Sequence, residues 1–382
     1  MPDILHKKIL YVGGFELPDK NAAAHRVLGN AKALREIGYE VVFLDVNRNI
    51  NGECLSRPHD TEGFITYSQR HANSFAGLLK YCCNPLHVEE ILQKHDNWHA
   101  IIAYNYPALA LWKLKTICRK RGLKIYGDCT EWHNLVSLSP KFLFIQIDMF
   151  FRMRFVQKHL DGMIVISHYL ENYYKKYTKT LVLPPLVDIQ DPKWSRRNIK
   201  PHSGIQLVYF GSPGTHKDML GEIISAVQQV SMDVRLQIVG LTKEQYLDTF
   251  PKDKNLVNEM TSNGQLHFCG RLSHKDTLEV VKNSDYSIFY RHRTRTNMAG
   301  FPTKFVESIS CGVPVITTDT SDLLRYTKDG KNALILPIDS FHKELILLME
   351  SMQNRQVFPP IVEIDSFDYR RYNEFINQFI GN

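Results

Sequence analysis

The sequence lacks the features that mark membrane-spanning, disulfide-linked or nucleic-acid-binding proteins. Its 382 residues contain no run of about 18 apolar residues, so no transmembrane span is expected. The seven cysteines are odd in number and scattered, with no CxxC pair. This pattern argues against a disulfide framework or a zinc site and favours free thiols in a reducing compartment. No zinc-finger spacing, RNA-recognition pattern or long Lys/Arg run occurs, so nucleic acid is not an expected partner.

The N-terminal segment also lacks a signal-peptide core, because the apolar run at residues 9–12 stops at Gly13. We therefore expect a cytoplasmic protein. A hydrophobic content of 43% and a charged content of 23% are those of a soluble globular protein. The length suits two domains of about 100–200 residues each. The formal charge of +7 suits a phosphorylated ligand or an anionic membrane surface.

The opening residues predict one βαβ unit. Residues 9–12 form a buried-strand run that Gly13 and Gly14 interrupt. Apolar residues at helical spacing follow over residues 22–37, Gly38 ends that helix, and residues 40–46 form the next strand. Such alternation predicts a parallel sheet with crossover helices.

The same alternation continues and then restarts, which predicts two Rossmann-like domains. Strands at residues 100–104, 123–127 and 162–166 complete a first domain over residues 1–190. A polar segment at 188–203, with Pro192 and Pro201, is the best linker. A second domain follows over residues 203–365, and residues 366–382 form a helix expected to pack back on the first domain. The predicted fold is α/β, with the two domains facing a central cleft and a ligand at the carboxyl ends of the strands.

The most informative segment runs from Asn297 into the strand at 313–317. A small-residue turn opens a helix, whose unpaired first-turn amides and dipole favour an anion. Lys304 lies in that first turn, where a bound diphosphate would offset its unfavourable position. Glu307 lies one turn further on the same face as Thr303 and Lys304, where a carboxylate can accept hydrogen bonds from a ribose diol. An ordinary crossover with a surface lysine and glutamate would give the same pattern.

This segment resembles the donor-binding region of GT-B glycosyltransferases of family 4, the glycosyl transferases of group 1. The resemblance rests on Gly300-Phe301, on Glu307 with the run Gly312-Val-Pro-Val-Ile, and on Asp329-Gly-Lys-Asn-Ala. It implies a GT-B fold and retaining transfer of a sugar from a UDP- or GDP-sugar to a hydroxyl of a glycan or lipid-linked acceptor. Assembly of surface polysaccharide or glycolipid is the implied setting. The family's Glu-x7-Glu pattern is incomplete, because its first position, which contacts the donor sugar, is Ala299.

The resemblance also implies roles for residues of the second domain. The turn at 211–217 keeps Lys217 but has Ser212 where the family usually has an arginine. Lys217 and Lys304, with the helix start, would stabilise the leaving diphosphate. Arg291, Arg293 and Arg295 could assist, although a solvated loop is the favoured interpretation of these three. The nucleobase would pack beside Arg271 and Leu272. No Asp-x-Asp lies near these elements, so a metal-independent reaction without a cofactor is expected.

In the first domain, Gly13 and Gly14 resemble the family's glycine loop, although a tight turn would also require them. Arg26 could reach a phosphate, but a solvent-facing helix arginine is the favoured interpretation. His133 matches a family histidine close to the transferred sugar, with Asp128 and Glu131 as neighbours that orient or replace it. A loop histidine that caps the next helix is the alternative.

Residues 141–160 alternate aromatic and basic side chains. A helix of this kind could contact the inner face of a membrane, where lipid-linked acceptors reside, although packing on the sheet is the favoured interpretation. Two other functions remain open for the chain as a whole. One is a nucleotide-sugar 2-epimerase on the same fold, and the other is a catalytically weak partner subunit that binds nucleotide sugars.

Overall fold

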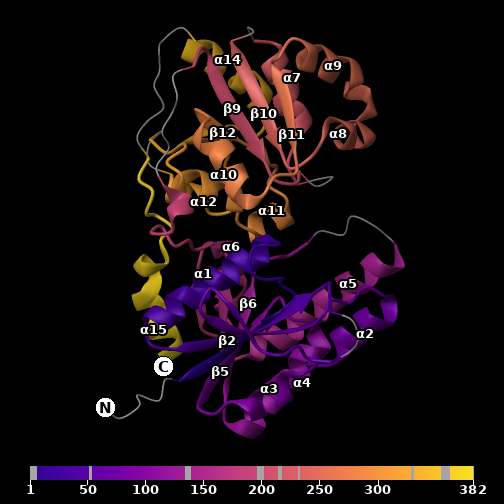
Figure 1. Ribbon diagram of the computed structural model, residues 1–382, viewed down its shortest axis with the longest axis vertical. Helices are drawn as coiled ribbons and strands as arrows, with labels where there is room; N and C mark the ends of the chain where they lie inside the picture. Colours follow the sequence, from indigo (N-terminus) through magenta and orange to yellow (C-terminus); the bar gives the residue numbers. More distant parts are fainter. Residues whose placement is uncertain are drawn as a thin grey trace. The chain divides into compact units, whose positions relative to one another are not determined.

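The computed structural model describes residues 7–50, 54–133, 139–195, 202–213, 217–230, 233–327, 331–353 and 362–381. It divides the chain into two compact units, each built on its own parallel sheet with helices around it (Figure 1). Unit 1 comprises Met1–Val187, Ala299–Phe301 and Asp368–Asn382, and unit 2 comprises Asp188–Met298 and Pro302–Phe367. The predicted α/β fold with two Rossmann-like halves is confirmed.

The sheet of unit 1 has the strand order β3-β4-β2-β1-β5-β6-β7-β8. Its neighbouring strands are parallel except for the antiparallel pair β3 and β4. The strands are β1 Lys8–Gly13, β2 Glu40–Asn47, β3 His59–Thr61, β4 Phe64–Arg70, β5 Trp98–Tyr104, β6 Lys124–Cys129, β7 Gly162–Val165 and β8 Thr180–Val182. The strands β3, β4 and β8 are missing from the sequence-based prediction.

Local sequence signals set several helix ends in unit 1. Asn21 caps α1, because its side chain accepts a hydrogen bond from the Ala24 amide, and Gly122 ends α4 with a φ of 68°. The helices are α1 Ala22–Glu36, α2 Phe75–Cys83, α3 Val88–Lys94, α4 Ala108–Arg121, α5 Pro140–Phe151, α6 His168–Tyr174 and α15 Asn373–Gly381. Short turns complete the unit: the π-helix η1 Arg152–Val156, η2 Gln157–His159 and η5 Tyr369–Tyr372.

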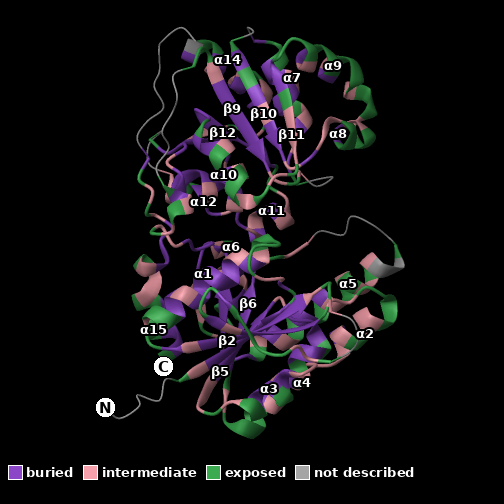
Figure 2. Ribbon diagram, in the orientation of Figure 1, coloured by how far each residue is buried: buried purple, intermediate pink, exposed green. Residues whose placement is uncertain are grey.

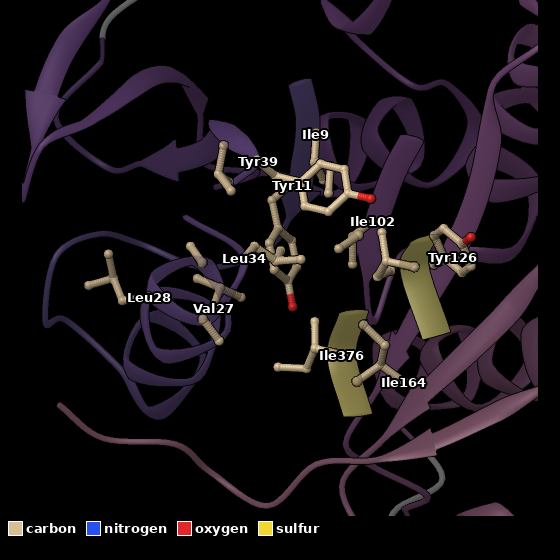
Figure 3. Close-up of a cluster of buried hydrophobic side chains, with 14 of the residues drawn as sticks. Ile9, Tyr11, Val27, Leu28, Leu34, Tyr39, Ile102, Tyr126, Ile164 and Ile376 are labelled. Atoms are coloured by element: carbon tan, nitrogen blue, oxygen red, sulfur yellow. The ribbon is translucent and has the colours of Figure 1, made fainter. Parts of the chain in front are cut away.

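The core of unit 1 lies between α1, the central strands and the C-terminal helix α15 (Figure 3). Tyr11 of β1 and Tyr126 of β6 are buried in it beside Ile376 of α15. The ring of Phe379 in α15 lies 5.3 Å from the ring of Tyr126. The last residues of the chain therefore complete the core of the unit in which the chain begins.

Unit 2 is built on a fully parallel sheet of order β11-β10-β9-β12-β13-β14. The inner strands β9, β12 and β13 are almost entirely buried, as parallel strands covered on both faces should be (Figure 2). The edge strands β11 and β14 each have one buried residue. The strands are β9 Ile205–Phe210, β10 Val234–Val239, β11 Leu266–Gly270, β12 Tyr286–Ile288, β13 Val315–Thr318 and β14 Ala333–Leu336. The helices are η3 Pro192–Trp194, α7 Leu220–Gln228, α8 Lys243–Thr249, η4 Pro251–Asp253, α9 Lys254–Ser262, α10 His274–Lys282, α11 Arg295–Ala299, α12 Thr303–Ser310, α13 Leu323–Tyr326 and α14 Phe341–Gln353.

Some predicted segments lie outside the described residues. They are residues 196–201 of the predicted linker, residues 214–216 of the predicted turn after β9, and Asp329 with Gly330. Strand β14 was not predicted. The helix expected over residues 141–160 is divided, because α5 ends at Phe151 and the π-helix η1 follows it.

Candidate functional site

Three adjacent strands of unit 2 end in glycine at the carboxyl edge of the sheet. Gly211, Gly240 and Gly270 follow or end β9, β10 and β11, with φ values of 90°, 116° and 66°. The Gly240 amide donates to the Gly270 carbonyl at 2.8 Å, and a Cβ atom on Gly240 would lie 2.8 Å from the Gly211 oxygen. The edge therefore presents bare backbone, which a ligand can approach closely.

A cluster of buried charges lies beside this edge. The Asp218 carboxylate accepts hydrogen bonds from Lys304 Nζ and Arg291 Nε, both at 2.5 Å, and from the Tyr209 hydroxyl at 2.7 Å. Lys304 Nζ also lies 3.3 Å from the Tyr209 hydroxyl. We call these four residues the Asp218 cluster. One carboxylate thus joins the first strand of the unit, the start of α12 and the segment after β12.

Burial and neighbouring charges act in opposite directions on the pKa of Asp218 but in the same direction on the pKa of Tyr209. Burial alone would raise the pKa of Asp218, but the charges of Lys304 and Arg291 outweigh it and hold that pKa below its ordinary value. Burial raises the pKa of Tyr209 well above its ordinary value, and the negative charge of Asp218 adds to the effect. The carboxylate is therefore ionised and the phenol neutral at physiological pH.

The cluster corrects two expectations about cations. Lys304 does not share an exposed face with Thr303 and Glu307, since it is only 7% exposed while those two are half-buried. Its counter-charge in the first turn of α12 is Asp218. The favoured interpretation of Arg291 as part of a solvated loop is wrong, because Arg291 is buried in the cluster. Arg293 is exposed and pairs with Asp319.

The other predicted donor residues of unit 2 lie nearer the solvent. Lys217 and Ser212 are exposed at either end of the turn after β9. Arg271 is exposed and Leu272 half-buried directly after β11. These positions follow two strands whose carboxyl ends share one edge of the parallel sheet.

Glu307 has a neighbour that the sequence did not suggest. Its Oε1 lies 3.5 Å from Nε2 of His274, the first residue of α10, and the His274 ring lies 5.9 Å from the ring of Trp194. The Glu307 carboxylate is thus held at one side while remaining partly exposed. Gly300 is half-buried and Phe301 buried, in the short segment Ala299–Phe301 that belongs to unit 1.

Gly13 and Gly14, the two glycines predicted to face a ligand in unit 1, have different roles. A Cβ atom on Gly13 would lie 2.8 Å from Cβ of Tyr104, so the close packing of β1 against β5 accounts for this glycine. Gly14 instead lines a cavity of about 270 Å³ with His71, Phe75 and Tyr81. Among the two, only Gly14 therefore faces space that a ligand could occupy.

Arg26 of α1 is not solvent-facing, contrary to the favoured interpretation. It is 2% exposed, and its Nη2 lies 2.7 Å from Oδ1 of Asp128 in β6. The Tyr11 hydroxyl donates to the same carboxylate at 2.5 Å, and Arg26 also donates to the Leu183 carbonyl at 2.9 Å. Burial would lower the pKa of Arg26, but Asp128 outweighs burial and raises it. Arg26 and Asp128 thus hold the core together and are not placed to bind a phosphate or to orient His133.

His133 lies beyond the carboxyl end of β6, as predicted for a residue at that edge. Its Nε2 lies 2.8 Å from Oε2 of Glu131, and both side chains are partly exposed. Glu131, rather than Asp128, is the neighbour that can orient the imidazole ring. Residues 134–138, which follow, are outside the described part of the chain.

Among the residues that the structure describes, no three His, Cys, Asp or Glu side chains come together in a way that could hold a metal ion. We therefore assign no metal site, and metal independence stays a prediction. No described helix is both long and apolar enough to cross a bilayer.

Comparison with known proteins indicates the class of protein to which the fold and this site correspond. Residues 190–358 match the family described as Glycosyl transferases group 1. No curated protein sequence matches the chain. The matched region covers most of unit 2, which contains the glycine edge and the Asp218 cluster.

Several solved structures share the fold across the whole chain. Sucrose-phosphate synthase from Thermosynechococcus elongatus superposes with a TM-score of 0.69 at 14% identity, over 97% of this chain and 98% of that one. Anabaena HepE in complex with UDP-glucose gives 0.62 at 17% identity, over 98% and 100%. An E. coli trehalose-6-phosphate protein bound with UDP-2-fluoro glucose gives 0.70 at 12%, over 98% and 99%. These likenesses confirm the GT-B fold, and the narrower assignment to family 4 stays a prediction.

Proposed function

We propose that the protein is a retaining glycosyltransferase that moves a sugar from a nucleoside-diphosphate sugar to an acceptor hydroxyl. The observation that carries the proposal is the carboxyl edge of unit 2, where bare glycine backbone lies beside exposed and buried cations. This edge falls within the region that matches the glycosyl transferases of group 1. The solved structures with UDP-glucose or UDP-2-fluoro glucose support UDP-sugars as the first donors to test.

In this proposal the donor diphosphate binds beside the turn that follows β9. Lys217, which is exposed, supplies a cation to the diphosphate, and the Ser212 hydroxyl can donate to a phosphate oxygen. Lys304 acts from within the Asp218 cluster, where two cations share one carboxylate. A neighbouring anion would favour the protonated form of Lys304, which burial disfavours.

The nucleoside is assigned to the other side of the same edge. Glu307 accepts hydrogen bonds from the ribose hydroxyls, with Thr303 one turn earlier on the same face of α12. The base packs beside Arg271 and Leu272, where backbone groups after β11 are available. Since Ala299 replaces the family's first glutamate, the donor sugar must be held by other groups. Gly300 and Phe301 stay in the proposal as parts of the turn before α12.

The chemistry requires a leaving group to gain charge. The bond from the anomeric carbon to the diphosphate oxygen breaks, and the acceptor oxygen bonds to that carbon on the same face. The proton of the acceptor hydroxyl passes to the leaving diphosphate. Lys217 and Lys304 stabilise the developing negative charge, as preorganised cations do in electrostatic catalysis. His133, oriented by Glu131, hydrogen-bonds the sugar, and Gly14 lines the entry for a glycan or lipid-linked acceptor.

A binding assay tests the donor site residue by residue. Titration calorimetry with UDP should show that Lys217→Ala raises Kd about tenfold or more, because a charge-assisted hydrogen bond contributes roughly 1.5–3 kcal/mol. Lys254→Ala is the matched control, since Lys254 is also an exposed lysine of unit 2 but begins α9, outside the turn after β9 and outside the segments that resemble the donor-binding region. Equal effects of the two variants would refute the diphosphate assignment.

The ribose contact needs a different comparison. If Glu307 binds the ribose diol, the wild-type protein should prefer UDP to 2′-deoxy-UDP, and Glu307→Ala should lose most of that preference. A preference that survives the substitution would place the diol elsewhere.

Turnover then separates the proposed transferase from its rivals. Wild-type protein incubated with a panel of UDP- and GDP-sugars and glycan or lipid-linked acceptors should release the nucleoside diphosphate, and NMR of the product should show retained anomeric configuration. A free epimer of the donor would indicate the 2-epimerase. Tight binding without turnover on any donor would indicate a binding subunit.

A further inference from the structure

One face of unit 1 leaves large apolar side chains in the solvent. It is formed by α2, α4, α5 and η1, and it does not overlap the donor residues of unit 2. Its exposed aromatic residues include Trp112 at 58% and Phe155 at 54%, and Leu109, Ile147, Phe150 and Phe151 are each more than 40% exposed. We call these six residues the apolar face. Residues 141–160 were expected to pack on the sheet, and Met149 and Met153 are indeed buried. The apolar side chains of the face that belong to this segment are exposed instead: Ile147, Phe150, Phe151 and Phe155.

The apolar face is continuous across its helices. Leu109 and Trp112 of α4 and Ile147 and Phe151 of α5 line a common cavity of about 390 Å³. The rings of Phe150, Phe151 and Phe155 lie within 6.0 Å of one another, so α5 and η1 present a single aromatic ridge. Exposed apolar area that is gathered in this way marks an interaction surface.

Charge identifies the kind of partner. The four elements α2, α4, α5 and η1 contain nine lysine or arginine residues and a single acidic residue, Asp148, which gives them a formal charge of +8. The whole chain carries +7. The charge of Asp148 is offset by the buried Arg152 nearby, so the other eight basic residues set the charge of these elements. A second copy of the chain would bring like charges together at this face. An anionic bilayer would instead match both the apolar side chains and the positive charge.

We propose that the apolar face docks unit 1 on an anionic lipid bilayer. The aromatic ridge enters the interfacial region, an acyl chain fills the cavity beside Trp112, and basic residues such as Arg119, Lys120 and Arg121 at the end of α4 contact lipid headgroups. The docking does not depend on donor binding, so its failure and the failure of the proposed function are separate results.

Vesicle flotation of the full chain tests the docking. Vesicles of phosphatidylcholine with 30% phosphatidylglycerol should bind the protein. Pure phosphatidylcholine vesicles should bind it at most about one tenth as strongly. The double variant Phe150→Ser, Phe155→Ser should lower binding to the anionic vesicles by about tenfold or more, because two half-exposed phenyl rings no longer enter the bilayer. Phe375→Ser is the matched control, since Phe375 is a 56% exposed phenylalanine of unit 1 that lies on α15.

The same preparation reports how deeply Trp112 enters the bilayer and whether the apolar face binds a second copy of the chain instead. Brominated lipids should quench Trp112 fluorescence, and Trp112→Phe should remove that quenching. The far-UV circular dichroism spectrum and the urea unfolding midpoint should be unchanged in the double variant, which verifies that the chain is folded. Equal loss in the Phe375→Ser control, equal binding to neutral and anionic vesicles, or a dimer that the double variant dissociates would each overturn the proposal.

Discussion

The Asp218 cluster makes a sharp prediction about stability, because one carboxylate serves two buried cations. Asp218→Asn keeps the volume of the side chain but removes its charge. Lys304→Met keeps most of the apolar stem of the lysine and removes the ammonium group. The two changes take away opposite partners of a single ion pair of 2.5 Å.

The expected losses of unfolding free energy differ because the two substitutions leave different charged groups without a partner. Asp218→Asn leaves Arg291 and Lys304, whose side chains are 5% and 9% exposed, without a counter-charge. Removing one partner of a buried pair destabilises a protein by about 3–5 kcal/mol. Lys304→Met leaves Asp218 still paired with Arg291 and hydrogen-bonded to Tyr209. Its loss should be about 0–2 kcal/mol, because methionine also avoids the desolvation of a buried ammonium group.

The double variant is the informative one. Asp218→Asn combined with Lys304→Met has one buried cation fewer than Asp218→Asn alone. We therefore expect it to be more stable than that single variant, with a coupling energy of about 2 kcal/mol in the double-mutant cycle.

Tryptophan positions give a direct assay. The chain has four tryptophans, at positions 98, 112, 132 and 194, and only Trp194 belongs to unit 2. Trp194 is buried, so its fluorescence in a background with the other three changed to phenylalanine reports the unfolding of unit 2 in urea. Effects of the two single variants that simply add would show that the pair does not couple. A Lys304→Met variant as unstable as Asp218→Asn would show that Arg291 alone does not stabilise the Asp218 carboxylate.

Three further predictions concern other buried groups. Arg26→Met leaves Asp128 buried without its cation and should lower the stability of unit 1 by about 3–5 kcal/mol in urea unfolding, while the exposed Arg35→Met should cost under about 1 kcal/mol. Burial raises the pKa of Asp45 from 3.8 to about 6, so the folded state binds more protons and stability falls as pH rises from about 4 to 6. Asp45→Asn should therefore stabilise the protein by up to about 3 kcal/mol at pH 7.5 and not at pH 4, and an equal gain at both pH values would contradict the shift. Gly240→Ala should cost about 2 kcal/mol more than Gly264→Ala, because both glycines have a positive φ but only Gly240 has backbone within 3.0 Å of the added carbon, and equal costs would refute the clash.

Hydrophobic periodicity predicted the architecture well where strands are central and fully buried. Strands were predicted at residues 9–12, 40–46 and 100–104, and the structure has β1, β2 and β5 within two residues of those bounds. The edge strand β3 escaped detection because two of its three residues are exposed, so it lacks a continuous apolar run. The helical pattern of residues 141–160 was recognised, but periodicity could not tell which of its apolar side chains would be covered.

The buried ions were beyond such patterns, because their partners are distant in sequence. Arg26 and Asp128 are separated by 102 residues, and Lys304 and Asp218 by 86. A lone arginine in a helix or a loop is usually exposed, which is why Arg26 was interpreted as solvent-facing on its helix and Arg291 as part of a solvated loop. Tyrosines in the first strand of each unit were the available signal. Tyr11 and Tyr209 each precede a glycine by two positions, and a fully buried phenol needs a hydrogen-bond partner.

In both units a buried tyrosine hydroxyl donates to a buried aspartate, but the number of cations paired with that aspartate differs. Tyr11 donates to Asp128, which pairs with one cation, and Tyr209 donates to Asp218, which pairs with two. The cluster of unit 1 is therefore neutral, whereas that of unit 2 carries one excess positive charge when Lys304 is protonated. An excess buried charge is unfavourable unless an anion lies nearby. The excess charge of the Asp218 cluster occurs beside the glycine edge, where the proposed diphosphate would supply that anion. Among the described partners of Asp128, in the unit assigned to the acceptor, there is no such excess charge.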